Sequence, residues 1–61
     1  MHKFTVGQTV QFAGPHFLRA APGPYEITRL VPHSGGEFQY RIKNSKESYE
    51  RIAKESQLTD L

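Results

Sequence analysis

Residues 25–43, YEITRLVPHSGGEFQYRIK, contain the pattern that decides the fold. Apolar and polar residues alternate on both sides of two adjacent glycines, and this period of two is typical of half-buried β-strands. Adjacent glycines supply the positive φ angles that a two-residue hairpin turn requires, whether the turn is Gly35-Gly36 or Ser34-Gly35. The segment therefore predicts an antiparallel β-hairpin.

The turn also predicts which side chains share a face of this hairpin. With a two-residue loop, the numbers of paired residues add up to an odd total, so odd positions of the first strand share a face with even positions of the second. Arg29 falls on the apolar face, and we expect its guanidinium to reach the rim along a packed stem, whereas Arg41 and Lys43 point away. The apolar side chains predicted on the buried face are Tyr25, Ile27, Val31, Phe38, Tyr40 and Ile42.

The rest of the chain is divided into short segments by four prolines and five glycines. Alternation predicts a first strand over residues 8–12, and residues 13–22 are too rich in proline and glycine for a helix or a central strand, so we expect a long loop there. Residues 49–54 are predicted to form a strand that ends in a short helical turn near residues 56–58. A helix is the alternative for this tail, because Tyr49, Ile52, Ala53 and Ser56 also fit helical spacing.

Length and composition indicate a single small domain, residues 1–61, with a narrow margin of stability. A 61-residue chain buries only about 60% of the surface that it exposes when unfolded. The absence of cysteine excludes disulfides and thiolate metal sites. The predicted core consists of Val10, Phe12, Tyr25, Ile27, Val31, Phe38, Tyr40, Ile42 and Ile52.

The charge pattern favours a solvated surface over a site for a polyanion. The net charge is +2 and the sequence pI is about 9.2, which is compatible with a nucleic-acid partner. Residues 31–61, however, intersperse five cations with five anions. No apolar run approaches the roughly 18 residues that a membrane-spanning helix needs. Because the chain also lacks a signal peptide and cysteine, we expect a cytoplasmic protein without membrane contact.

Four stretches together resemble a group of short, uncharacterised bacterial proteins with an SH3-like small β-barrel, an architecture shared with Tudor and KOW modules. The stretches are residues 7–10 (GQTV), 23–27 (GPYEI), 40–43 (YRIK) and 50–58 (ERIAKESQL), and the similarity extends from residue 4 to residue 58. The resemblance implies an all-β fold, a single SH3-like barrel of four to five antiparallel strands. It also implies that YERIAKES is the closing strand and that SQL is the short turn after it. It implies no catalytic residue.

Residue types that carry catalysis are present, but not in catalytic patterns. His2, His16 and His33 are separated by 14 and 17 residues, which matches no common metal-ligand spacing. The serines lack a strand-turn-helix nucleophile elbow, and the glutamates lie beside basic residues. We therefore expect no enzymatic activity, no metal and no cofactor.

The sequence favours a non-enzymatic binding or adaptor module for a protein partner. The long loop and the hairpin turn are expected to line a groove, with Phe17, Leu18, Arg19 and His33 at its edge. Open strand edges allow a monomer or a weak homo-oligomer built edge to edge. The alternative is weak, sequence-independent nucleic-acid binding through a basic strand face, which would depend steeply on salt. The cations of that alternative are Arg19, Arg29, Arg41, Lys43 and Arg51.

Overall fold

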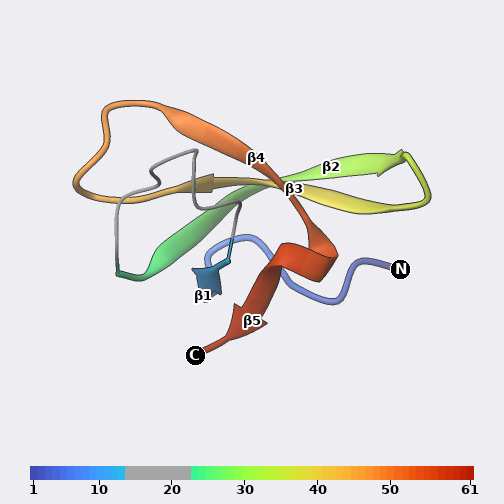
Figure 1. The fold of residues 1–61 in the computed structure, drawn as a ribbon, viewed down its shortest axis with the longest axis horizontal. Helices are drawn as coiled ribbons and strands as arrows, with labels where there is room; N and C mark the ends of the chain where they lie inside the picture. The colour runs from blue at the N-terminus through green and yellow to red at the C-terminus, as the bar shows by residue number, and fades with distance from the viewer. Residues whose placement is uncertain (14–22) are drawn as a thin grey trace.

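The computed structural model describes residues 1–13 and 23–61, and these form an all-β fold (Figure 1). The strands make one antiparallel sheet in the order β4-β3-β2-β1-β5. A short 3-10 helix, η2 (Glu55–Gln57), connects β4 to β5. The strands are β1 (Thr9–Phe12), β2 (Tyr25–Ser34), β3 (Glu37–Lys43), β4 (Glu50–Lys54) and β5 (Leu58–Asp60).

The predicted all-β class, the first four strands and the helical turn after β4 are confirmed. A helix over residues 49–54 is wrong, because every residue of β4 pairs with β3. The sequence pattern did not predict β5, which pairs with Val10, Gln11 and Phe12 of β1. β4 and β5 lie at opposite ends of the strand order and do not pair with each other, so the sheet of the described residues is open.

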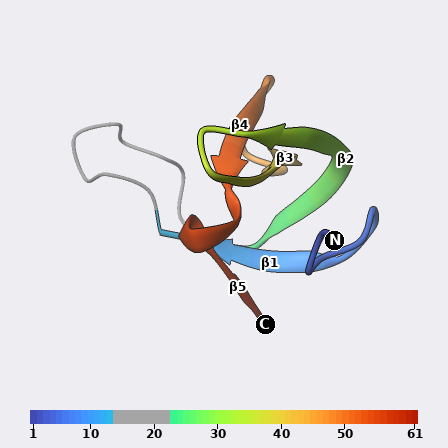
Figure 2. The same ribbon diagram turned by 90° about the vertical axis from the view of Figure 1, so that its right-hand side faces the viewer.

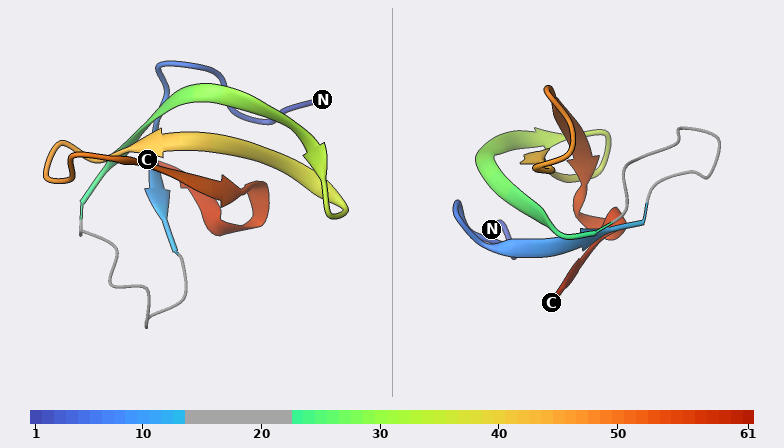
Figure 3. Two further views of the ribbon diagram at one scale, coloured as in Figure 1. Left: turned by 90° about the horizontal axis from the view of Figure 1, so that it is seen from above. Right: turned by 90° about the vertical axis from the view of Figure 1, so that its left-hand side faces the viewer.

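β2 is long enough to take part in both halves of the sheet. Tyr25 and Glu26 pair with β1, and the strand pairs with β3 from Glu26 to Ser34. Figure 2 shows β2 arching from β1 to β3 and β4, and Figure 3 shows this arch from the opposite side. The N-terminal segment leads into β1, and its Phe4 is buried in the core. It also extends the pairing with β2, because Gly7 donates to the Ile27 carbonyl at 2.7 Å and Ile27 donates to the Gln8 carbonyl at 2.9 Å.

The β2–β3 hairpin turns at Gly35-Gly36, whose φ angles are 63° and 90°. Ser34 pairs with Glu37, so the predicted two-residue turn is confirmed. The register then shifts twice along β2, between residues 31 and 34 and between residues 27 and 29. Each shift of this kind is a bulge that moves the following side chains to the other face of the sheet.

These bulges change which β2 side chains share the face of Tyr40. Between the bulges, Leu30 pairs with Tyr40, and Arg29 pairs with Arg41. The prediction that Arg29 and Val31 lie on the face of Tyr40 is therefore wrong. An alternating sequence pattern does not reveal a bulge, because the extra residue of the bulge can be of any type that also occurs in a regular strand.

The core lies on the face of the sheet that carries Tyr40 and Ile42, which we call the inner face. The prediction that Ile52 belongs to this core is wrong, because Ile52 is 52% exposed. Ala53 takes its place, because Ala53 is the β4 residue that pairs with Tyr40. Phe12, Val31 and Phe38 are only half-buried. The buried core is Phe4, Val10, Tyr25, Ile27, Tyr40, Ile42, Ala53 and Leu58.

Candidate functional site

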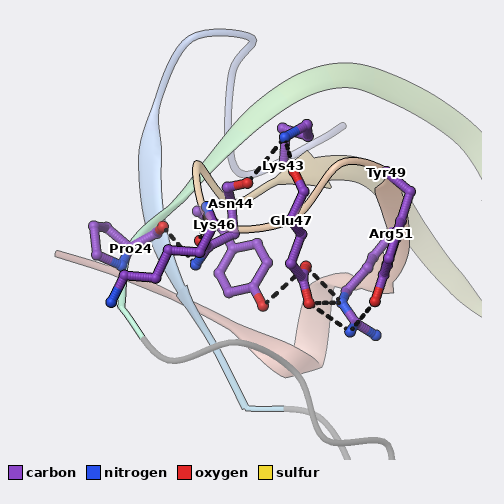
Figure 4. Close-up of polar contacts among 8 residues, drawn as sticks. Pro24, Lys43, Asn44, Lys46, Glu47, Tyr49 and Arg51 are labelled. Carbon is purple, nitrogen blue, oxygen red and sulfur yellow. Dashed lines mark hydrogen bonds and ion pairs between the residues drawn. The ribbon is translucent and has the colours of Figure 1, made fainter.

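A polar cluster holds the turn between β3 and β4 (Figure 4). The Lys43 ammonium donates to the carbonyl oxygen of Asn44 at 3.0 Å and to that of Glu47. Asn44 is buried; its amide donates to the Pro24 carbonyl at 3.3 Å and accepts the Lys46 backbone N–H at 2.7 Å. Because these bonds close the turn, Lys43 acts as part of the fold.

Glu47 and Arg51 form a largely buried ion pair in the same cluster. Arg51 donates through Nε to Oε1 at 3.0 Å and through Nη2 to Oε2 at 2.7 Å. These hydrogen bonds raise the pKa of Arg51. The hydroxyl of Tyr25 lies 3.5 Å from Glu47 Oε1, and its pKa is raised by burial and then by the charge of Glu47. The guanidinium of Arg51 is therefore held by Glu47 within the fold.

A second polar cluster ties η2 to the N-terminal segment. The Tyr40 hydroxyl donates to Glu55 Oε2 and accepts the backbone N–H groups of Lys3 at 2.9 Å and Phe4 at 3.1 Å. Burial raises the pKa of Tyr40, and the bond to Glu55 raises it further. The same bond lowers the pKa of Glu55, with a smaller contribution from the N–H of Lys3. Burial and the Tyr40–Glu55 bond together account for the pKa shifts of these two groups.

The opposite side of β2, β3 and β4, which we call the outer face, carries side chains that remain exposed. Arg29, Arg41 and Ile52 lie in one row across the three strands, because Arg41 pairs with both of the others. Arg41 forms an exposed ion pair with Glu50 at 3.4 Å. Arg29 has no ion-pair partner within residues 1–13 and 23–61. The next row along the strands is Val31, Gln39 and Lys54.

β4 is the last strand of the sheet, and two hydrogen bonds show how its backbone is oriented. Thr28 Oγ1 donates to the Arg41 carbonyl at 3.2 Å, so the Arg41 carbonyl points toward β2 and away from β4. The Lys54 N–H donates to Gln57 Oε1 at 3.0 Å instead of to β3. Since backbone groups alternate in direction along a strand, those of Glu50 and Ile52 also point away from β3. No strand among the described residues lies on that side.

The structure separates the binding residues that the sequence predicted. Phe17, Leu18 and Arg19 lie outside the described residues, as does most of the predicted groove. Arg41 is exposed on the outer face, whereas Lys43 is held by the β3–β4 turn. His33 is exposed near the end of β2, and its ring meets the edge of Phe38 with centroids 5.0 Å apart.

Phe38 is the centre of a small aromatic group near the β2–β3 turn. The ring of His2 lies 4.4 Å from the ring of Phe38 by centroid distance. His2 Nε2 also lies 2.7 Å from the Val31 carbonyl oxygen, which ties the N-terminus to β2. Phe38 is therefore covered by two imidazole rings, those of His2 and His33, and does not lie bare.

The edge residues Ile52 and Lys54 were not predicted as binding residues. Ile52 was assigned to the predicted core, and Ala53 was not. Ala53 is also apolar, so alternation alone did not decide which of the two faces inward. The charge pattern of β4 was a usable signal, since Glu50, Ile52 and Lys54 share one parity and only Ile52 among them is apolar.

Comparison of the chain with protein-family models, with characterised proteins and with solved structures finds no match. Within the described residues, no group of three or more histidine, aspartate or glutamate side chains is placed to hold a metal ion. The described part of the chain also has no helix of the length and apolarity needed to cross a membrane. The candidate site therefore rests on geometry: the free edge of β4 together with the outer face beside it.

Proposed function

We propose that this domain is a non-enzymatic protein-binding module that takes up an extended segment of its partner as an added strand along β4. The observation that carries this proposal is Ile52, which is 52% exposed on an edge strand whose outward backbone groups have no strand to pair with among the described residues. In strand addition, backbone hydrogen bonds provide affinity and alternate side chains provide specificity.

The side chains around this edge suit a protein partner. Soluble proteins usually protect a free edge with charges, bulges or very short strands, because unpaired backbone groups recruit other chains. β4 has charged residues at both ends, Glu50 and Lys54, but Ile52 stands exposed between them. An apolar centre with a charged rim is the usual composition of a protein-protein contact.

An SH3-like barrel is the architecture that we propose for the whole domain. Its support is the strand order, in which β1 lies between β2 and β5 while β2 also pairs with β3. Further support comes from η2, which follows β4 directly, as the resemblance implies for the short turn after YERIAKES. Binding through loops or strand edges, without chemistry, is a common use of such small scaffolds.

The polar clusters support a role without catalysis. Tyr25, Tyr40, Arg51 and Glu55 have shifted pKa values, and each is bonded to a residue that holds a turn or a terminus in place. Shifted pKa values mark catalytic sites only when the groups meet in a cleft where a substrate reaches them. We therefore assign these groups to stability.

The test compares two substitutions of Ile52, one that removes the backbone N–H and one that keeps it. Ile52→Pro removes the outward N–H, which edge strands tolerate, whereas Ile52→Thr removes the apolar side chain and keeps the N–H. Peptides selected from a random library on the wild-type domain should bind Ile52→Pro at least about tenfold more weakly, a loss of about 1.4 kcal/mol. They should bind Ile52→Thr more tightly than Ile52→Pro.

Amide hydrogen exchange gives the second readout. A bound strand should slow the exchange of the Glu50 and Ile52 amides, because these groups gain partners. If the selected peptides instead bind Ile52→Pro as tightly as wild type and protect neither amide, the module uses a different surface.

Nucleic-acid binding is the second candidate function, and one observation favours it. Arg29 and Arg41 are directly opposed on the outer face, where like charges repel each other. Glu50 pairs with Arg41, whereas Arg29 has no anion of its own among the described residues. A phosphate group would supply that anion. Binding of a single-stranded oligonucleotide should then weaken steeply with salt and be reduced in Arg29→Gln. Oligonucleotide binding that is unchanged in Arg29→Gln would argue against this surface.

A further inference from the structure

We infer that the partner of the β4 edge is the β4 edge of a second copy of this chain, paired antiparallel with Ile52 on the two-fold axis. This inference rests on the proposed function and names the partner of the same edge. It is carried by three independent features of β4: the charges, the direction of the backbone groups and the exposure of Ile52.

The charges of β4 are complementary to themselves. The strand reads ERIAK from Glu50 to Lys54. When two copies pair antiparallel about Ile52, Glu50 of each copy lies opposite Lys54 of the other. A parallel arrangement would instead place Glu50 against Glu50 and Lys54 against Lys54, so the charges select the antiparallel one.

The backbone of β4 selects the same register. The N–H and C=O groups of Ile52 point away from β3, so Ile52 and its copy form a hydrogen-bonded pair in which each donates to the other and accepts from it. The outward N–H of Glu50 meets the carbonyl of Lys54 in the second copy. The Lys54 N–H is already bonded to the side chain of Gln57, so the new ladder ends where η2 begins.

The side chains on the outer face complete the contact. Glu50, Ile52 and Lys54 share one parity, so in the pair all of them lie on the outer face, with the two Ile52 side chains adjacent at the centre. Pairing covers apolar surface that is exposed in the single chain. Arg41 lies beside Ile52 on β3 and extends the charged rim through its ion pair with Glu50.

The other end of the sheet does not offer the same complementarity. β5 has three residues, and its centre is Thr59. Self-pairing about Thr59 would oppose Leu58 with Asp60, which gains neither a charge pair nor an apolar contact. Asp60 also already accepts a hydrogen bond from Gln8 at 3.1 Å. β4 is therefore the edge at which two copies fit.

The interface is short, so the association should be weak. Interfaces below about 1,200 Å² of buried surface belong to transient complexes, and a five-residue strand lies in this class. We expect a dissociation constant on the order of 0.1–1 mM, with exchange fast enough for one averaged set of NMR signals.

Reversal of single charges tests the register directly. Glu50→Lys places lysine against lysine at both ends of the pair, and Lys54→Glu places glutamate against glutamate. Each variant alone should self-associate at least about fivefold more weakly than wild type in sedimentation equilibrium, since opposed like charges repel. An equimolar mixture of the two variants restores opposite charges at both ends, so it should associate at nearly the wild-type strength.

Two results would overturn the inference. The first is a mixture that associates no more tightly than either variant alone. The second is a wild-type chain that stays monomeric up to a concentration of about 1 mM, the upper end of the range expected for such a short interface. Both variants should remain folded, because Glu50 and Lys54 are exposed, and thermal unfolding checks this.

Failure of this inference is distinguishable from failure of the proposed function. Without self-association, selected peptides that still lose affinity for Ile52→Pro would keep the edge as a site for other chains. In the opposite result, the selected peptides bind Ile52→Pro with unchanged affinity, while the mixture of Glu50→Lys and Lys54→Glu associates. The edge would then serve self-pairing only.

Discussion

The Tyr40 hydroxyl donates a hydrogen bond of 2.5 Å to the Glu55 carboxylate and so connects the middle of β3 to η2, the helical turn before β5. The same hydroxyl accepts the backbone N–H groups of Lys3 and Phe4. One side chain therefore joins three segments that are far apart in the sequence. In a chain with few buried groups, removal of this hydroxyl should have a large effect.

Tyr40→Phe should lower the free energy of unfolding by about 1–3 kcal/mol, because the buried Phe4 N–H loses its acceptor. Urea denaturation followed by circular dichroism measures the change. The matched control is Tyr49→Phe, since Tyr49 is 55% exposed and should change stability by less than about 0.5 kcal/mol. Equal effects of the two substitutions would contradict the role of the Tyr40 hydroxyl.

The stability of the domain should fall in mild acid because of Glu55. Its pKa is lowered in the folded state by the Tyr40 hydroxyl and the Lys3 N–H, so the unfolded chain takes up a proton at a higher pH than the folded one. The contribution of Glu55 is therefore complete above the ordinary glutamate pKa of about 4.3 and is lost as the pH falls through the folded-state value.

Urea unfolding at a series of pH values between about 3 and 6, which brackets the ordinary glutamate value, measures this dependence. Glu55→Gln keeps an oxygen that accepts hydrogen bonds but does not titrate, so its stability should change less over this range. If the wild type and Glu55→Gln lose stability in parallel, the acid sensitivity belongs to other carboxylates.

The two ion pairs of β4 should differ strongly in their contribution to stability. Arg51→Ala leaves the Glu47 carboxylate, whose side chain is 8% exposed, without its cation and should cost about 3 kcal/mol. Arg41→Ala breaks an exposed pair with Glu50 and should cost less than about 1 kcal/mol. Chemical denaturation of both variants checks the difference, and a smaller loss for Arg51→Ala than for Arg41→Ala would refute it.

The two glycines of the β2–β3 turn should respond differently to substitution. The φ angles of 63° at Gly35 and 90° at Gly36 fit a type I′ turn, which accepts asparagine at its first position and prefers glycine at its second. An added Cβ meets no atom within 4 Å at either position, so any cost arises from the backbone.

We therefore expect Gly35→Asn to change stability by less than about 0.5 kcal/mol. Gly36→Ala should cost about 1–2 kcal/mol, because alanine is strained at this positive φ angle. Thermal unfolding of the two variants measures these changes. A larger loss for Gly35→Asn would indicate a different turn.

Local patterns were sufficient for the strands and the turn. Alternation located β1, β2 and β3, and the double glycine predicted the two-residue turn, because strand period and positive φ depend on neighbouring residues only. Tyr25, Ile27, Tyr40 and Ile42 were placed in the core correctly for the same reason.

Contacts between distant segments decided the rest. The β2 bulges set the face of Arg29, and pairing with Tyr40 chose Ala53 over Ile52 for the interior. β5 has three residues and becomes a strand through its pairing with β1, which no short-range signal reports. The exposed edge around Ile52 exists because β4 is the last strand in the order, and strand order follows from how the whole chain packs its core.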